Sequence, residues 1–92
     1  MTHLISYSLH RPGQEYSRLY KAIESISGTY WHHTTSAWLV ETPLSAKQVY
    51  DLISPYALDA NDEIVVFRLQ GDWYGKINES DGLNWLHKRK FL

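Results

Sequence analysis

The apolar residues of this chain recur with two different spacings, and these spacings predict the order of its elements. Residues 3–9 (HLISYSL) are rich in β-branched and aromatic side chains and are followed by the Pro12-Gly13 turn, so they predict a first strand. Between residues 14 and 27 the apolar side chains recur every three or four positions, which predicts an amphipathic helix. Gly28 follows, and a glycine in the left-handed conformation often comes just past a helix.

The middle of the chain predicts a hairpin and a second helix. Residues 29–33 and 36–42 are rich in β-forming side chains and are separated by a short polar stretch, as in an antiparallel hairpin that Pro43 then ends. Ser45 is followed three residues later by Gln48, which is the spacing of a capping box. The apolar stripe that follows predicts a helix ending near Pro55.

The last third of the chain predicts one more strand and a terminal helix. Residues 64–69 (IVVFRL) are apolar at consecutive positions, which is typical of a strand covered on both sides or lying at an interface. Residues 76–78 have the pattern of a short edge strand. Ser80 or Asp81 can cap a helix over residues 82–90, with Leu83 and Leu86 facing inward.

This order of strand, helix, strand, strand, helix, strand predicts an α+β fold with one domain over residues 1–92. We expect a ferredoxin-like (βαββαβ) sandwich, in which an antiparallel sheet carries two helices on one face, plus a short C-terminal helix. The other face of the sheet must then be polar, or be covered by the tail or by a second subunit. The four tryptophans, Trp31, Trp38, Trp73 and Trp85, are candidates for covering it.

Composition limits the classes of function. Nine Lys and Arg against ten Asp and Glu give a net charge of −1, so the chain has no bulk attraction to nucleic acid, and any such contact must be local. Cysteine is absent, which excludes disulfides and a thiol nucleophile. No apolar stretch approaches the about 20 residues of a membrane span, so we expect a soluble, cytoplasmic protein.

Candidate chemistry gathers at the end of the first strand. Ser8 and His10 are two positions apart and share a face, at a strand end where open sheets often bind ligands. The histidine has the chemistry of an acid or base, and the hydroxyl and neighbouring Arg11 have that of phosphate ligands. The alternative is that these are solvated loop residues. His32 and His33 are adjacent on a strand and point to opposite faces, so we expect no metal site there.

A second basic cluster lies near the end of the chain. Lys88, Arg89 and Lys90 have the charge to contact phosphates of a nucleic acid. The alternative is structural, because cations in the last turn of a helix complement its dipole.

Several segments taken together resemble a known family. The strand HLISYSLH, the helix YSRLYKAIESISG, the hairpin YWHHTTSAWLVETPLSAKQVYDLI and the strand DEIVVFRLQGDWYG look like the small SinR-like proteins of the CRISPR-associated protein two and VapD-like group. The resemblance covers about residues 3–75. It implies a homodimer with the end of the first strand near the dimer axis, and we expect its interface to include Tyr7, Trp38, Phe67 and Trp73.

In the nuclease-type members of this group, a Tyr-Asp pair ends the first strand and supplies a metal-binding carboxylate from each subunit. Here the pair is Tyr7-Ser8, and a serine hydroxyl is a poor substitute for a carboxylate toward a hard cation such as Mg²⁺. We therefore expect no metal or other cofactor.

Three functions follow as expectations. The first is a catalytically degenerate homodimer that binds nucleic acid or a partner in a defence or toxin-antitoxin system. The second is a metal-independent ribonuclease that uses His10, with Ser8 or Arg11. The third is a protein-interaction module with no role in nucleic-acid binding, in which an exposed strand edge or aromatic face docks another chain.

Overall fold

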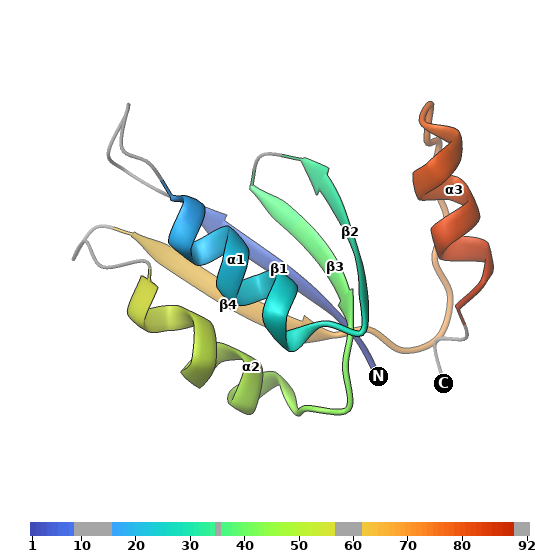
Figure 1. The fold of residues 1–92 in the computed structure, drawn as a ribbon. Coiled ribbons are helices and arrows are strands. Elements are labelled where there is room, and N and C mark those ends of the chain that lie inside the picture. The colour runs from blue at the N-terminus through green and yellow to red at the C-terminus, as the bar shows by residue number, and fades with distance from the viewer. Residues whose placement is uncertain (9–15, 35, 57–61, 90–92) are drawn as a thin grey trace.

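The chain folds into a four-stranded antiparallel sheet with three α-helices (Figure 1). The computed structural model describes residues 1–8, 16–34, 36–56 and 62–89. The elements are β1 (Thr2–Ser8), α1 (Ser17–Ile26), β2 (Thr29–Thr34), β3 (Ala37–Glu41), α2 (Ala46–Ile53), the 3₁₀ turn η1 (Ser54–Tyr56), β4 (Glu63–Arg68) and α3 (Ser80–His87). The expected α+β class is confirmed.

The strands lie side by side in the order β2-β3-β1-β4, and every neighbouring pair is antiparallel. Leu4 of β1 pairs with Leu39 of β3 on one side and with Phe67 of β4 on the other. Because side chains alternate across a sheet, these three residues share one face, and their chain neighbours share the opposite one.

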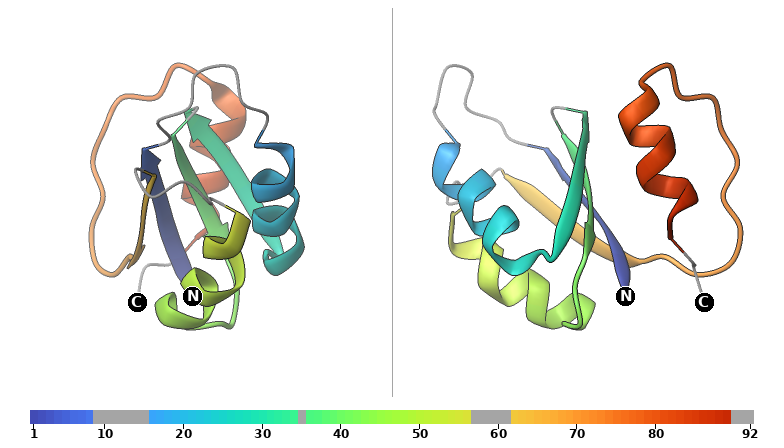
Figure 2. Two further views of the ribbon diagram at one scale, coloured as in Figure 1. Left: turned by 90° about the vertical axis from the view of Figure 1, so that its left-hand side faces the viewer. Right: turned by 45° about the vertical axis from the view of Figure 1, so that its right-hand side comes forward.

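The inner face of the sheet is covered by α1 and α2 (Figure 2). Each helix buries residues four positions apart, Leu19 with Ile23 and Val49 with Ile53, as one face of an amphipathic helix does. The resulting inner core consists of Ile5, Tyr7, Leu19, Ile23, Trp38, Val40, Val49 and Ile53. Ser45 and Gln48 form the predicted capping box, which fixes where α2 begins.

The outer face of the sheet is partly covered by α3, which lies on the side opposite α1 and α2 (Figure 2). A second apolar cluster forms there from buried Trp31, Leu39 and Leu86. The partly buried residues packed against it are Leu4, Leu69, Trp73, Ile77 and Trp85. Three of the four tryptophans therefore cover the outer face, as expected, whereas Trp38 belongs to the inner core.

Polar contacts and a glycine hold α3 in place. Trp85 Nε1 donates to Thr29 Oγ1 at 3.0 Å, and Arg89 Nε lies 3.2 Å from Glu41 Oε2. A Cβ at Gly82 would overlap the indole of Trp31, so only glycine lets the helix approach the sheet this closely.

Some sequence-based bounds differ from the structure. Residues 76–78 form no strand, and the backbone there stays irregular. Gly28 lacks the expected positive φ, because α1 ends instead with Ser27 in an extended conformation. The helix α3 begins at Ser80, and no side chain caps it. Positions 14 and 15, which the sequence assigns to the first helix, lie outside the described residues.

Within the part of the chain that the structure describes, every helix is too short or too polar to cross a bilayer.

Candidate functional site

The end of β1 forms a shallow depression on the surface. Ser8 is exposed and pairs across the sheet with Glu63, and Ser6 pairs with Val65. All four residues line a hollow of about 310 Å³. The described part of the site expected from the sequence is thus a concave surface with two serine hydroxyls and one carboxylate.

These residues do not fit the magnesium ion that the family resemblance implies. A hard divalent cation takes several oxygen ligands, with carboxylates favoured, and Glu63 is the one carboxylate among the described residues that line the hollow. No group of three or more His, Cys, Asp or Glu side chains gathers anywhere in the described residues. Glu63 also places negative charge beside Ser8, which disfavours an approaching phosphate.

The predicted nucleic-acid contacts divide into three groups. Arg11 and Lys90 lie outside the described residues, as does His10, the predicted catalytic acid or base. Lys88 is exposed just after α3. Arg89 is held within the fold: its side chain is 12% exposed, lies beside Glu41, and stacks 4.1 Å over the ring of Trp85. The guanidinium of Arg89 therefore connects Trp85 of α3 with Glu41 of β3.

The predicted dimer-interface residues also separate. Tyr7 and Trp38 are 5% and 2% exposed, respectively, and lie in the inner core beneath the helices. Trp38 Nε1 donates to Tyr7 Oη at 3.0 Å, and burial raises the pKa of the Tyr7 phenol well above its ordinary value of 10. Tyr7 and Trp38 therefore present no surface to another chain, because both side chains are on the face that α1 and α2 cover.

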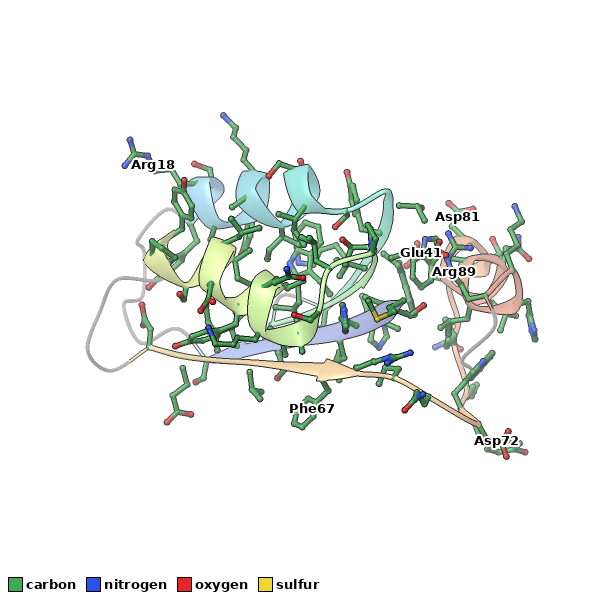
Figure 3. All side chains as sticks on the ribbon, turned by 90° about the horizontal axis from the view of Figure 1, so that it is seen from below. Arg18, Glu41, Phe67, Asp72, Asp81 and Arg89 are labelled. Atoms are coloured by element: carbon green, nitrogen blue, oxygen red, sulfur yellow. The ribbon has the colours of Figure 1, made fainter. Side chains whose placement is uncertain are left out.

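Phe67 behaves differently. Its side chain is 52% exposed and points away from α1 and α2 (Figure 3). Val65, two positions before it on the same face, is 44% exposed. We call the part of the outer face beside the outer cluster the open-face patch. It consists of the exposed residues Val65 and Phe67 and the half-buried residues Leu4, Ser6 and Ala37. Consecutive apolar residues in 64–69 were the sequence signal for it. The fourth predicted residue, Trp73, is half-buried in the outer cluster.

The adjacent histidines are on opposite faces, as expected. His32 stacks on Trp38 with ring centroids 3.9 Å apart, and His33 lies 4.3 Å from the ring of Trp31. Desolvation lowers the pKa of His32 below its ordinary value. Each histidine ring therefore packs against a tryptophan, and the two rings do not point toward a common ligand.

Sequence reasoning missed a cavity of about 310 Å³ on the outer side of the sheet. We call it the outer-layer cavity. The residues that matter for its chemistry are Trp31, His33, Asp72, Trp73, Tyr74 and Lys76. They come from β2 and from the connection between β4 and α3, and no contiguous motif marks them.

No protein-family model, curated protein or solved structure matches this chain.

Proposed function

We propose that this chain is a non-catalytic homodimer with a ferredoxin-like arrangement, in which two copies meet through the open-face patch. The observation that carries the proposal is the exposure of Val65 and Phe67, at 44% and 52%, on the part of the outer face that α3 leaves uncovered, next to half-buried Leu4. Burying such side chains is favourable by about 25 cal/mol for each Å² of apolar surface removed from water.

The ferredoxin-like arrangement is supported by the strand order and the connections. In the order β2-β3-β1-β4, α1 links two strands that have β3 between them, and α2 links two strands that have β1 between them. This is the pattern of two interlocked split βαβ units. The proposal also keeps the resemblance to the SinR-like, CRISPR-associated protein two and VapD-like group, as a homodimer in a defence or toxin-antitoxin system.

A second copy of the chain suits the patch because the patch contains no charged side chain. In a two-fold interface the same patch of both copies is buried, so a charged side chain within it would be desolvated twice. The net charge of −1 adds little repulsion between copies. A stable interface buries about 800 Å² on each partner, so we expect half-buried Trp73 of the adjoining outer cluster to contribute.

The non-catalytic part of the proposal is supported by the hollow at Ser8. Its hydroxyls and single described carboxylate lack the ligand set for a metal-dependent cut. Binding to a protein partner is favoured over binding to nucleic acid, because Arg89 is engaged with Glu41 and the overall charge is close to neutral. Incubation with RNA and DNA in magnesium should therefore give no cleavage.

The oligomeric state tests the proposal. Light scattering after size exclusion should give twice the chain mass for the wild type and the chain mass for Phe67→Glu, because each copy would bury an unpaired carboxylate in the interface. Tyr50→Glu is the matched control: Tyr50 is 44% exposed, but it lies on α2, away from the patch. It should remain a dimer.

A monomeric wild type at high concentration would overturn the proposal, as would a dimer that survives Phe67→Glu. Far-UV circular dichroism of each variant checks that the fold is intact. If Tyr50→Glu dissociates and Phe67→Glu does not, the interface is on the helix face instead.

A further inference from the structure

The outer-layer cavity has the size and the walls of a small-molecule site. Its volume of about 310 Å³ falls at the lower end of the range of about 300–1,000 Å³ for ligand pockets. Trp31 and His33 line it from β2, and Leu86 lines it from α3. Leu39 lines it from β3, and the connection over residues 69–77 supplies the remaining walls.

Four aromatic rings line the cavity together with four aliphatic side chains. Trp31 and His33 are two positions apart on β2 and share its outer face, with ring centroids 4.3 Å apart. Trp73 approaches from the connection, and Tyr74 is fully exposed beside it. Flat, polarisable rings from two segments favour a ligand that itself carries an aromatic ring.

Two opposite charges lie at the rim. Asp72 and Lys76 both line the cavity and both are exposed, and Figure 3 shows Asp72 on the connection beyond β4. No ion pair joins Asp72 to Lys76, although the structure describes both residues. A ligand with a single charge would be attracted by one and repelled by the other, whereas a zwitterion complements both.

We propose that the outer-layer cavity binds a small zwitterion with an aromatic side chain, of the aromatic amino acid class. The ring lies against Trp31 and Trp73, the ligand's ammonium pairs with Asp72, and its carboxylate pairs with Lys76. A nucleoside shares the stacking but leaves both rim charges unpaired, and the phosphate of a nucleotide would face Asp72. No residue of the open-face patch lines this cavity, but Trp73 is shared with the proposed dimer interface, so binding is measured on the monomeric Phe67→Glu variant as well as on the wild type.

Three related probes separate the contributions. L-Phenylalanine carries both charges, phenethylamine carries only the ammonium, and 3-phenylpropionate carries only the carboxylate. Titration calorimetry on the full chain should give saturable binding of L-phenylalanine, with a dissociation constant on the order of 1 mM or below for a ligand of this size. The two truncated probes should bind more weakly, and uridine and adenosine more weakly still.

Charge variants should then give a crossed pattern. Asp72→Asn should weaken L-phenylalanine and phenethylamine by about two- to fivefold, the range of exposed charge pairs, without weakening 3-phenylpropionate. Lys76→Gln should weaken L-phenylalanine and 3-phenylpropionate and spare phenethylamine. Asp51→Asn is the matched control, because Asp51 is an exposed acid on α2 and lines none of the cavity. It should change nothing.

The aromatic wall is tested with Trp73→Leu, which keeps an apolar side chain in the outer cluster and removes the ring. This variant should weaken all three probes. The proposal is overturned if L-phenylalanine shows no saturable binding, if nucleosides bind more tightly than it does, or if Asp72→Asn and Lys76→Gln affect the charged probes alike.

Discussion

The hydrogen bond between Trp38 and Tyr7 joins the two large polar aromatic side chains of the inner core. Trp38 Nε1 donates to the Tyr7 hydroxyl at 3.0 Å, and both residues are buried. A buried indole N–H needs an acceptor, and the phenol supplies it from the neighbouring strand. The pair therefore lets two bulky residues be buried together without an unsatisfied donor.

Replacing Tyr7 with phenylalanine should destabilise the chain at neutral pH. Trp38 Nε1 would lose its acceptor, and an unsatisfied buried donor costs about 1–3 kcal/mol in the free energy of unfolding. Tyr74→Phe is the matched control, because Tyr74 is fully exposed. Urea denaturation at pH 7 should show the loss for Tyr7→Phe and none for the control.

The same variant should change the stability at alkaline pH. Burial raises the pKa of folded Tyr7 above its unfolded value of 10, so the folded chain keeps a proton that the unfolded chain releases. The contribution of this phenol is fully present below pH 10 and declines as pH rises above 10. Tyr7→Phe should decline less steeply than wild type in that range. An identical decline in both would contradict the assigned burial.

For single residues, the sequence predicted contacts within one element better than it predicted which side chains are buried. The capping box of Ser45 and the opposite faces of His32 and His33 follow from spacing along one element, and the structure agrees. Tyr7 and Trp38, which we expected at a dimer interface, are buried in the inner core. Aromatic residues cover both faces of this sheet, so residue type alone does not tell which face a given ring is on.

At the scale of elements, α3 is the feature that most depends on a single position. Gly82 is buried against Trp31, whose Nε1 has no hydrogen-bond partner in the described structure. The helix is thus held by apolar burial of Leu86, by the hydrogen bond of Trp85 and by the ion pair of Arg89 with Glu41. These interactions offset the cost of the unsatisfied indole N–H of Trp31.

Gly82→Ala should destabilise the chain, although alanine is favoured over glycine inside helices by up to about 1 kcal/mol. The added Cβ would overlap the indole of Trp31, and overpacking of this kind costs about 1–3 kcal/mol. Gly75→Ala is the matched control, because nothing lies within 4 Å of a Cβ there and its φ is not positive. Thermal denaturation compares the two, and a stabilised Gly82→Ala would contradict the close packing of α3.

The helices and long strands were predictable from periodicity, whereas the connection before α3 was not. The segment 76–78 has only three residues, and a pattern that short is the same for a short strand and for a loop that buries one side chain. The structure shows the second case, in which Ile77 packs on the outer cluster without strand pairing. The outer-layer cavity escaped prediction for the same reason, because its walls come from segments that only tertiary packing brings together.

For the whole molecule, the important fact is that the sheet is covered unequally. The sequence required that the outer face be polar, or be covered by the tail or by another subunit. In the structure α3 packs on Trp31 and Leu39, on β2 and β3, while Val65 and Phe67 on β4 remain exposed. Part of the outer face is therefore covered by the tail, and the proposed second copy would cover the rest.

If the two copies associate through that remaining part, thermal stability should depend on concentration. Association stabilises the folded chain by mass action, so the Tm of the wild type should rise as the chain concentration rises. Phe67→Glu should show a lower Tm at high concentration and no such dependence. Calorimetric scans across a wide concentration range measure this, and a constant wild-type Tm would argue against the dimer.

The unequal division of the tryptophans has a practical consequence. Trp38 is the one tryptophan of the inner core, whereas Trp31, Trp73 and Trp85 belong to the outer cluster. Intrinsic tryptophan fluorescence therefore reports mainly on how α3 packs against the sheet. Far-UV circular dichroism reports on the backbone of all the helices and strands. With Trp38 replaced by phenylalanine, the remaining emission would serve as a built-in optical label for the release of α3 from the sheet, with no dye attached.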